Sequence, residues 1–348
     1  MKRSALTLVE LLVVIAILGI LFFLLTPAIR TTGRGAARRA ICQNNLRQIA
    51  LAMINFESAH QCFPSSTGVA GFSGVGSSDQ LGPLVQILPF LDDVEKYDRV
   101  SKGYTIGNQS FPPFPALDVV EYEPWKKTIP LFICPKIPDT PSTFAKTHYG
   151  LCLGDRARNI HAPETARGAF SGQQKLSRMD IGDGTSNTVM AGEIGARTYA
   201  TQENRYAINR PSSILESPVE CYELVDGNGE DWQFAKGVSL SSMARGGHWA
   251  DGRAGVALFN TILPPNSPSA SIGEIGADGI YSASGPHPGG VNIARLDGSV
   301  SFVDANIDAG DSSQPTLTEE EMKSGVASPY GVWGAFGTID GGEVANEF

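Results

Sequence analysis

Charged residues are scarce in this sequence. Asp, Glu, Lys and Arg supply 18% of the 348 residues, against roughly 25% in an average globular protein. Their place is taken by 39 Gly and 22 Pro residues, which favour turns and interrupt helices. Because 42% of the residues are apolar, the chain is not broadly disordered. The composition therefore predicts a turn-rich globular part built from short β-strands.

The motifs of familiar enzymes are also missing. The chain contains no G-x-S-x-G nucleophile turn, no H-E-x-x-H zinc helix and no phosphate-binding P-loop, each of which indicates a specific chemistry. We therefore expect no enzymatic activity, and a hydrolytic function in particular has no motif to support it.

Cysteine occurs only five times, and no two copies have the close spacing of a zinc finger. In an exported protein some of them would form disulfides. Cys42 with Cys62 and Cys134 with Cys152 are candidate pairs, although sequence separation alone does not fix the pairing. Because the five cysteines, Cys42, Cys62, Cys134, Cys152 and Cys221, are odd in number, at least one thiol stays free.

Positive charge is concentrated at the start of the chain. Residues 1–50 hold seven Lys or Arg and one acidic residue, Glu10, whereas the rest of the chain holds 20 basic and 35 acidic residues. The two parts therefore carry net charges of +6 and −15, which sum to −9. An acidic body lacks the cationic surface that nucleic-acid binding needs, so no nucleic-acid partner is expected.

Residues 11–29 form an uncharged run of 19 residues. As a helix this run spans roughly 28 Å, close to the hydrocarbon thickness of a bilayer. A cleaved secretory signal has a shorter apolar core followed by a small-residue cleavage site. We therefore predict a retained transmembrane helix over residues 6–30. Basic residues on both sides of the run leave its orientation open.

A second helical pattern follows the apolar run. Cys42, Leu46, Ile49, Met53 and Phe56 recur at intervals of four, three, four and three residues, which is the spacing of one helix face. Residues 31–58 are therefore predicted to continue the helix, with this apolar seam packed on a globular body of residues 59–348.

Local patterns also predict elements within the body. The apolar residues 129–135, which contain two prolines, indicate a buried strand. The dipeptide Asp297-Gly298 between two β-prone runs predicts a hairpin with a two-residue turn. In that hairpin Ile293 faces Phe302 across the strands.

Two further segments give weaker patterns. Residues 188–193 follow a turn and read as a short strand. Thr318 and Glu321 have the spacing of a capping box, which predicts a short helix that stops at Gly325.

The N-terminus resembles the start of type IV prepilins. The resemblance is carried by KRSALTLVE at positions 2–10 and LLVVIAILG at positions 11–19. It implies a leader of residues 1–5, cleavage between Ala5 and Leu6 by a prepilin peptidase and N-methyltransferase, methylation of Leu6 and a retained Glu10. Ala5 and Leu6 stand where that family usually has Gly and Phe. The resemblance also implies a single-pass inner-membrane protein whose large domain is periplasmic or at the cell surface.

A second resemblance extends from about residue 2 to residue 348. HPGGVNIARLDG at 287–298 has the form H-x9-D-G, and NNLRQI at 44–49, DGTSNT at 183–188 and PPN at 264–266 precede it. These segments are similar to the bacterial family called domain of unknown function 1559. The family implies an α+β, pilin-like fold with a long N-terminal helix that is first transmembrane and then amphipathic. The second half of this helix packs on an antiparallel β-sheet, which carries large loop-rich β elaborations. The H-x9-D-G motif then lies in a hairpin at residues 287–303.

His287 and Asp297 have side chains suited to metal binding or acid–base chemistry. They lie at opposite ends of the first hairpin strand, roughly 20–30 Å apart if the segment is extended, so we interpret them, with Gly298, as structural. No catalytic residue and no metal site are predicted. Calcium is the one cofactor considered, with the ligand candidates Asp304, Asp308 and Asp311, and a solvated acidic surface is the alternative interpretation.

Two functions fit these observations. The first is a non-enzymatic, membrane-anchored pilin- or pseudopilin-like protein whose partners are membrane lipid, the prepilin peptidase, like subunits and a secretion or pilus platform. Glu10 then lies at the membrane interface or pairs with the amino terminus of a neighbouring subunit. The alternative is a membrane-tethered solute- or glycan-binding module with a site around Trp232, Trp249 and Trp333. Exposed tryptophans would favour the binding module, and buried ones the structural role.

Overall fold

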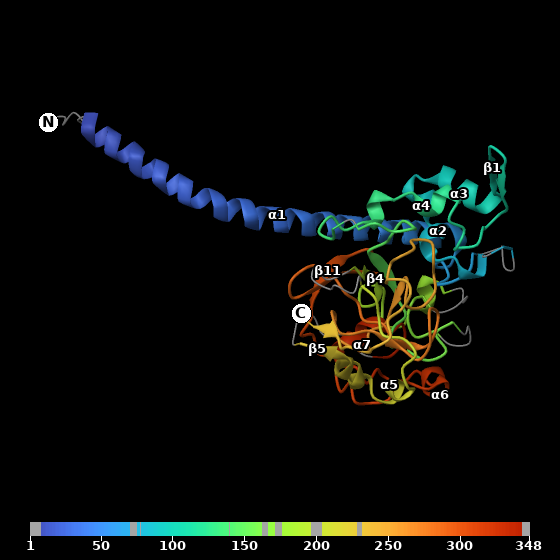
Figure 1. Cartoon of the computed structure of the whole chain (residues 1–348). Helices are drawn as coiled ribbons and strands as arrows, with labels where there is room; N and C mark the ends of the chain where they lie inside the picture. Colours follow the sequence, from blue (N-terminus) through green and yellow to red (C-terminus); the bar gives the residue numbers. More distant parts are fainter. Residues whose placement is uncertain are drawn as a thin grey trace.

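The computed structural model describes residues 8–69, 75–76, 78–138, 140–161, 166–170, 176–195, 204–227 and 232–342, without the side chains of residues 22–34 and 78. One helix, α1 (Leu8–His60), contains 53 residues and is about 80 Å long at 1.5 Å per residue. Its N-terminal half projects away from the body, and its C-terminal half lies along it (Figure 1). The two predicted helical segments are therefore one continuous helix.

The buried half of α1 uses the predicted seam. Cys42, Leu46, Ile49, Met53 and Phe56 are between 0% and 4% exposed, so the prediction that this face packs on the body is confirmed. By contrast, the large apolar side chains between Leu8 and Leu21 on the projecting half are between 48% and 79% exposed.

Within the described residues, no helix has an apolar segment of the length needed to cross a membrane. The predicted leader 1–5 lies outside the described residues, as do residues 6 and 7 and the side chains of residues 22–30 of the predicted transmembrane segment.

A five-stranded sheet forms the centre of the body, in the order β11-β10-β4-β3-β7. Its members are β3 (Tyr149–Cys152), β4 (Val189–Glu193), β7 (Leu258–Phe259), β10 (Gly290–Arg295) and β11 (Val300–Asp304). Neighbouring strands are antiparallel except β3 and β7, which are parallel. The architecture is therefore α+β with a mixed sheet, where a purely antiparallel sheet was expected.

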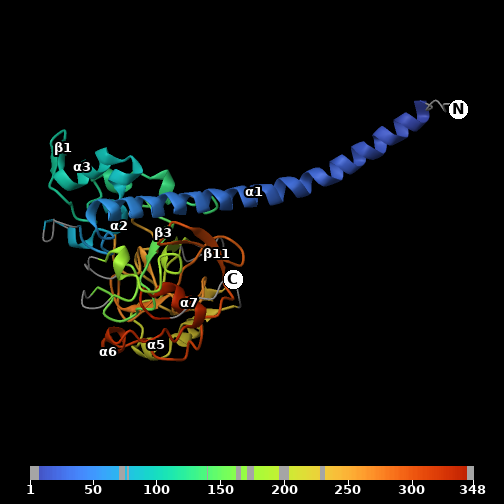
Figure 2. The same ribbon diagram turned by 180° about the vertical axis from the view of Figure 1, so that it is seen from behind.

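The two faces of the sheet pack on different helices. α1 contacts β10, β11 and β4, and α7 (Gly331–Gly337) lies on the opposite side (Figure 2). Because side chains alternate along a strand, Val291 and Ile293 of β10 join the cluster of Trp333 and Phe336, whereas Asn292 points toward α1 and accepts a hydrogen bond from Gln43.

Short elements complete the described body. The two-stranded sheets pair β1 (Tyr104–Ile106) with β2 (Gln109–Phe111), β5 (Val225–Asp226) with β6 (Gln233–Phe234), and β8 (Ala270–Ser271) with β9 (Gly279–Ile280). The helices are η1 (Ser78–Gln80), α2 (Pro83–Gln86), η2 (Leu88–Leu91), α3 (Val94–Lys102), α4 (Glu123–Lys126), η3 (Pro130–Phe132), η4 (Arg178–Asp180), α5 (Ser213–Glu216), η5 (Pro218–Leu224) and α6 (Glu319–Lys323).

Two local predictions are confirmed and one is wrong. Residues 188–193 contain strand β4, and α6 begins with the predicted capping box, in which Thr318 and Glu321 satisfy each other's backbone nitrogens. Residues 129–135, however, are not a strand, because Pro130 starts the single turn η3. Proline lacks the N–H group that a central strand needs but fits the first turn of a helix.

The hairpin of β10 and β11 forms, but its register differs by one residue from the prediction. Phe302 faces Asn292, and Ile293 faces Ser301. The turn is longer than two residues, because Gly298 donates to Arg295 O at 2.9 Å and Arg295 donates to Ser299 O at 2.9 Å. Gly298 has φ +85°, the conformation that follows a type I turn in a three-residue hairpin loop.

Candidate functional site

Four buried side chains with metal-ligand chemistry meet where α1 crosses the sheet. Cys42 belongs to the α1 seam, Cys134 follows η3, Glu193 ends β4, and His287 lies in the loop before β10. Their ligand atoms all lie within 4.8 Å of one another. We call these four residues the buried cluster. Its members come from segments that are far apart in sequence, so the cluster exists only in the folded chain.

The two cysteines of the buried cluster form a disulfide with a Cα–Cα distance of 5.3 Å. Both predicted pairs, Cys42 with Cys62 and Cys134 with Cys152, are therefore wrong. The helix separates Cys42 from Cys62, because 18 residues of α1 between Cys42 and His60 rise about 27 Å.

Cys152 is separated from Cys134 by the sheet. Its side chain belongs to the cluster on the α7 face, together with Val291 and Trp333, whereas Cys134 packs on the α1 face. Cys152 and Cys221 are buried free thiols, and Cys62 is also buried. Burial raises the pKa of Cys152 and of Cys221 to about 12, which keeps both as unreactive thiols at neutral pH.

Glu193 is the polar centre of the buried cluster. Its Oε1 lies 3.1 Å from Nε2 of His287 and accepts a hydrogen bond from the side-chain amide of Asn292 at 3.1 Å. Its Oε2 accepts from the backbone nitrogen of Asn292 at 2.8 Å. His287 and Glu193 are 3% and 0% exposed in their side chains. A buried carboxylate needs such donors, because an unpaired charge is costly to remove from water.

Hydrogen bonds with His148 and Asn45 fix the segment that carries Cys134. The backbone nitrogen of Cys134 donates to Nδ1 of His148 at 2.9 Å. The Asn45 amide of α1 donates to Ile133 O at 3.0 Å and to the Tyr149 hydroxyl at 3.3 Å. Burial, with the nearby Glu193 carboxylate, raises the pKa of Tyr149, so this hydroxyl stays neutral. These contacts hold the cysteine segment against both α1 and β3.

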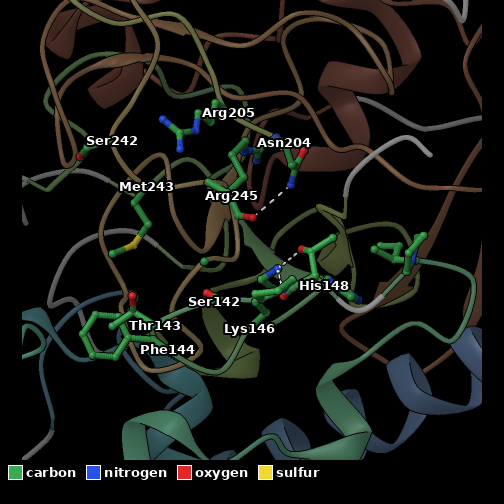
Figure 3. A pocket seen from close by; sticks show the side chains of 16 residues that line it. Ser142, Thr143, Phe144, Lys146, His148, Asn204, Arg205, Ser242, Met243 and Arg245 are labelled. Atoms are coloured by element: carbon green, nitrogen blue, oxygen red, sulfur yellow. Dashed lines mark hydrogen bonds between the residues drawn. The ribbon is translucent and has the colours of Figure 1, made fainter. Parts of the chain in front are cut away.

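A pocket of about 440 Å³ has His148 in its wall (Figure 3). Its described lining is the segment 140–148 with Ile137 and Pro138 on one side, and Asn204, Arg205 and residues 242–247 on the other. His148 lines this pocket and also holds the Cys134 backbone. The wall of the pocket is therefore in contact with the segment that carries Cys134 of the buried cluster.

The charged side chains among the described lining residues of the pocket are Lys146, Arg205 and Arg245. Arg205 donates to Ser241 O at 3.3 Å, and Lys146 donates to Thr140 O at 3.0 Å. Arg245 is buried and donates to Leu258 O at 2.9 Å and to Ser282 O. Burial lowers its pKa to about 10, so it stays charged at neutral pH. These three side chains give the described part of the lining a positive charge.

The predicted motif residues have separate positions. His287 is 4% exposed and belongs to the buried cluster, whereas Asp297 is exposed and its Oδ1 accepts from Ser299 N at 2.8 Å in the turn. The strand β10 separates them, so the prediction that they do not meet is confirmed, and Gly298 has its turn role. Ala5 and Leu6 lie outside the described residues, and Glu10 lies on the projecting half of α1.

The calcium candidates do not form a common site. Asp304 accepts from the backbone and side chain of Asn306, Asp308 accepts from Gly310 N, and Asp311 accepts from Ser313 and Gln314. Each carboxylate thus stabilises its own turn. Among the described residues, the one group of three or more potential metal ligands is the buried cluster.

The tryptophans do not form an exposed aromatic surface. Trp249 and Trp333 are 1% and 0% exposed, and Trp232 is half-buried, with its indole N–H bonded to Asn266 O. The predicted binding surface around these three residues is therefore wrong, because Trp249 and Trp333 are part of the hydrophobic core.

The sequence analysis did not identify Glu193 as a site residue. One signal was available: an acidic residue ends the otherwise apolar strand of residues 189–193, and a buried acid requires a partner. Which partner it has depends on the pairing of β4 with β10, which the local sequence does not specify.

A family model described as "Protein of unknown function (DUF1559)" matches residues 31–310, which are 280 of the 348 residues. This match confirms the predicted family, whereas the prepilin-type start and the role of the H-x9-D-G motif stay predictions. No curated protein and no solved structure matches the chain.

Proposed function

The chain belongs to the DUF1559 family of proteins of unknown function, and we propose that it is a non-enzymatic, membrane-anchored pilin-like protein. In this proposal a prepilin peptidase cleaves the chain between Ala5 and Leu6. The apolar residues 11–29 then hold it in the inner membrane, and the body is displayed outside the cytoplasm. Its partners are membrane lipid and either like subunits or a secretion or pilus platform.

The division of α1 into two halves carries this proposal. The second half is buried on the sheet and covalently attached to the body through Cys42. The first half projects beyond the body with its apolar side chains exposed (Figure 1). Exposed apolar residues on every side of a helix are unfavourable in water and favourable in lipid. A bilayer is the environment that suits this half.

The disulfide supports placement of the body outside the cytoplasm. Disulfides form and persist in the periplasm and at cell surfaces, whereas cytoplasmic thiols are kept reduced in most organisms. Cys42 lies only 13 residues after Ile29, the last residue of the apolar run, so the side of the membrane on which Cys42 oxidises is also the side that holds the body.

The proposal is tested on the full chain recovered from membranes. N-terminal sequencing and intact mass should give a chain that starts at methylated Leu6, and cells without a prepilin peptidase should give a chain that starts at Met1. A Met1 start in both cells would refute processing. Lateral assembly is tested by cross-linking in membranes: Glu10→Ala should abolish cross-linked oligomers, and Glu216→Ala, a change on the distant body, should leave them.

A second candidate function is a membrane-tethered module that binds a small anionic solute. The cationic pocket beside His148 favours it. Calorimetric titration with phosphate, citrate and glucuronate tests this function. Saturable binding that Lys146→Ala weakens at least fivefold, while Lys102→Ala does not, would support it. Heats no larger than those of dilution for all three probes would reject it.

A further inference from the structure

The buried cluster has the ligand types of a zinc site. Cysteine sulfur, histidine nitrogen and carboxylate oxygen are the atoms that bind Zn²⁺ in proteins, in most structural sites as a tetrahedral set of four. Cys42, Cys134, Glu193 and His287 supply four such atoms from four segments. All four residues are buried, as expected for a structural site that is closed to water.

The distances around His287 match the edges of such a tetrahedron. Zinc bond lengths of about 2.0–2.1 Å to nitrogen and oxygen and about 2.3 Å to sulfur give edges of about 3.3 Å for N···O and about 3.6 Å for N···S. Nε2 of His287 lies 3.1 Å from Glu193 Oε1 and 3.8 Å from Cys134 Sγ. The edge between the two sulfurs is much shorter than in a zinc site, because the two sulfurs are bonded to each other.

We propose that Cys42, Cys134, Glu193 and His287 bind one Zn²⁺ ion when the two cysteines are thiols. The sulfur edge then has to widen to about 3.8 Å. Rotation about each Cα–Cβ bond accomplishes this while the Cα atoms stay near their present separation of 5.3 Å. The ion and the disulfide exclude each other, because zinc needs two thiolates.

Outer contacts already orient the ligands. Asn292 holds both oxygens of Glu193, and Gln43 of α1 in turn donates to Asn292. Hydrogen bonds to a metal ligand fix its direction and contribute to metal affinity.

The site would attach α1 to the sheet before the disulfide forms. A newly made chain in the cytoplasm carries thiols, and binding of Zn²⁺ to two thiols releases two protons. In the purified protein the disulfide is opened by a phosphine. The phosphine is oxidised to its oxide with oxygen from water, and the two sulfurs become thiols.

The experiment uses the full chain in detergent, reduced by a phosphine that is then removed without oxygen. One Zn²⁺ per chain should bind to the reduced protein, and none to the oxidised protein. Co²⁺ in place of Zn²⁺ should give thiolate-to-metal charge transfer and the intense visible bands of tetrahedral cobalt. Zinc should also protect Cys42 and Cys134 from alkylation, as read by mass spectrometry.

Variants locate the site. Cys42→Ser and His287→Ala should each lower zinc affinity at least tenfold, and Cys221→Ser, which changes a buried free thiol, should leave it unchanged. Zinc uptake that persists in His287→Ala would overturn the assignment. If a variant fails to fold, the reduced wild-type protein still decides: absence of the cobalt charge-transfer band, or alkylation of Cys42 unaffected by zinc, would refute the proposal.

Discussion

Glu193 of β4 accepts two hydrogen bonds from Asn292 of β10, one from the backbone nitrogen at 2.8 Å and one from the side-chain amide at 3.1 Å. Because Asn292 also accepts from Gln43 of α1, the carboxylate connects two strands and, through Asn292, the long helix. His287 adds a third contact at 3.1 Å. The buried carboxylate is therefore a junction between the helix and the sheet.

Replacement of Glu193 tests this junction in the oxidised protein. Glu193→Ala leaves buried donors of Asn292 and His287 without an acceptor, and should lower the free energy of unfolding by about 3–5 kcal/mol. Glu193→Gln keeps one carbonyl acceptor and should cost less. Urea unfolding measures both.

The matched control is Glu216→Gln. This residue forms an ion pair with Arg158, and its side chain is 60% exposed, so the change should cost less than about 1 kcal/mol. Equal losses for Glu193→Ala and Glu216→Gln would contradict a structural role for the buried carboxylate.

The disulfide should contribute a large share of the stability of the body. It joins residues 92 positions apart, and closing so long a loop restricts the unfolded chain strongly. Reduction in the presence of a metal chelator should lower the free energy of unfolding by about 2–4 kcal/mol. Urea unfolding with and without the phosphine gives the value.

A double variant, Cys42→Ser with Cys134→Ser, provides the control for reduction. It should have the stability of the reduced protein and should not respond to the phosphine. If the phosphine destabilised the double variant as strongly as the wild type, the loss would come from something other than this disulfide.

Adjacent glycines of the H-x9-D-G segment should respond differently to alanine. A Cβ atom on Gly290 would overlap the backbone oxygen of Val303 on the paired strand, whereas a Cβ atom on Gly289 meets open space. Gly289 has φ +81°, so Gly289→Ala should cost about 1 kcal/mol from backbone strain alone. Gly290→Ala should cost clearly more, because β10 and β11 have to separate. Thermal unfolding of both variants tests this difference. Similar unfolding midpoints for Gly289→Ala and Gly290→Ala would contradict it.

Local sequence patterns predicted the parts of the fold that local physics determines. The α1 seam from Cys42 to Phe56 repeats with the helical period, and the Thr318 capping box lies within four residues, so neither depends on distant contacts. Residues 129–135 were assigned wrongly because a short apolar run fits a strand or a buried turn equally well, and the effect of Pro130 on the backbone decides between them.

The buried cluster could not be predicted from local sequence patterns, for a different reason. Its residues lie at positions 42, 134, 193 and 287, and they meet only because α1 crosses β4 and β10. The disulfide prediction failed on the same point, since it favoured cysteines that are close in sequence. The rise of α1 moves Cys62 away from Cys42, and the sheet places Cys152 on the face opposite Cys134.

Mild acid should destabilise the protein through a buried histidine. His248 is 0% exposed, lies between Trp125 and Phe144, and accepts a hydrogen bond at Nδ1 from Ala250 N. Burial lowers its pKa from 6.5 to about 4. Between these values the unfolded chain binds a proton that the folded chain excludes, so stability falls as the pH drops below about 6.5. At pH 5 the loss relative to pH 8 is about 2 kcal/mol from this residue.

The change in urea midpoint between pH 8 and pH 5 measures this effect. His248→Gln should reduce the pH dependence even if it lowers stability at pH 8, because glutamine does not titrate. Some pH dependence of stability should remain in His248→Gln, because burial also lowers the pKa of His161. This remainder should be smaller and have the same sign. His60→Gln, a change at an exposed histidine, is the control and should retain the wild-type slope. An unchanged slope in His248→Gln would show that His248 does not exclude its proton in the folded state.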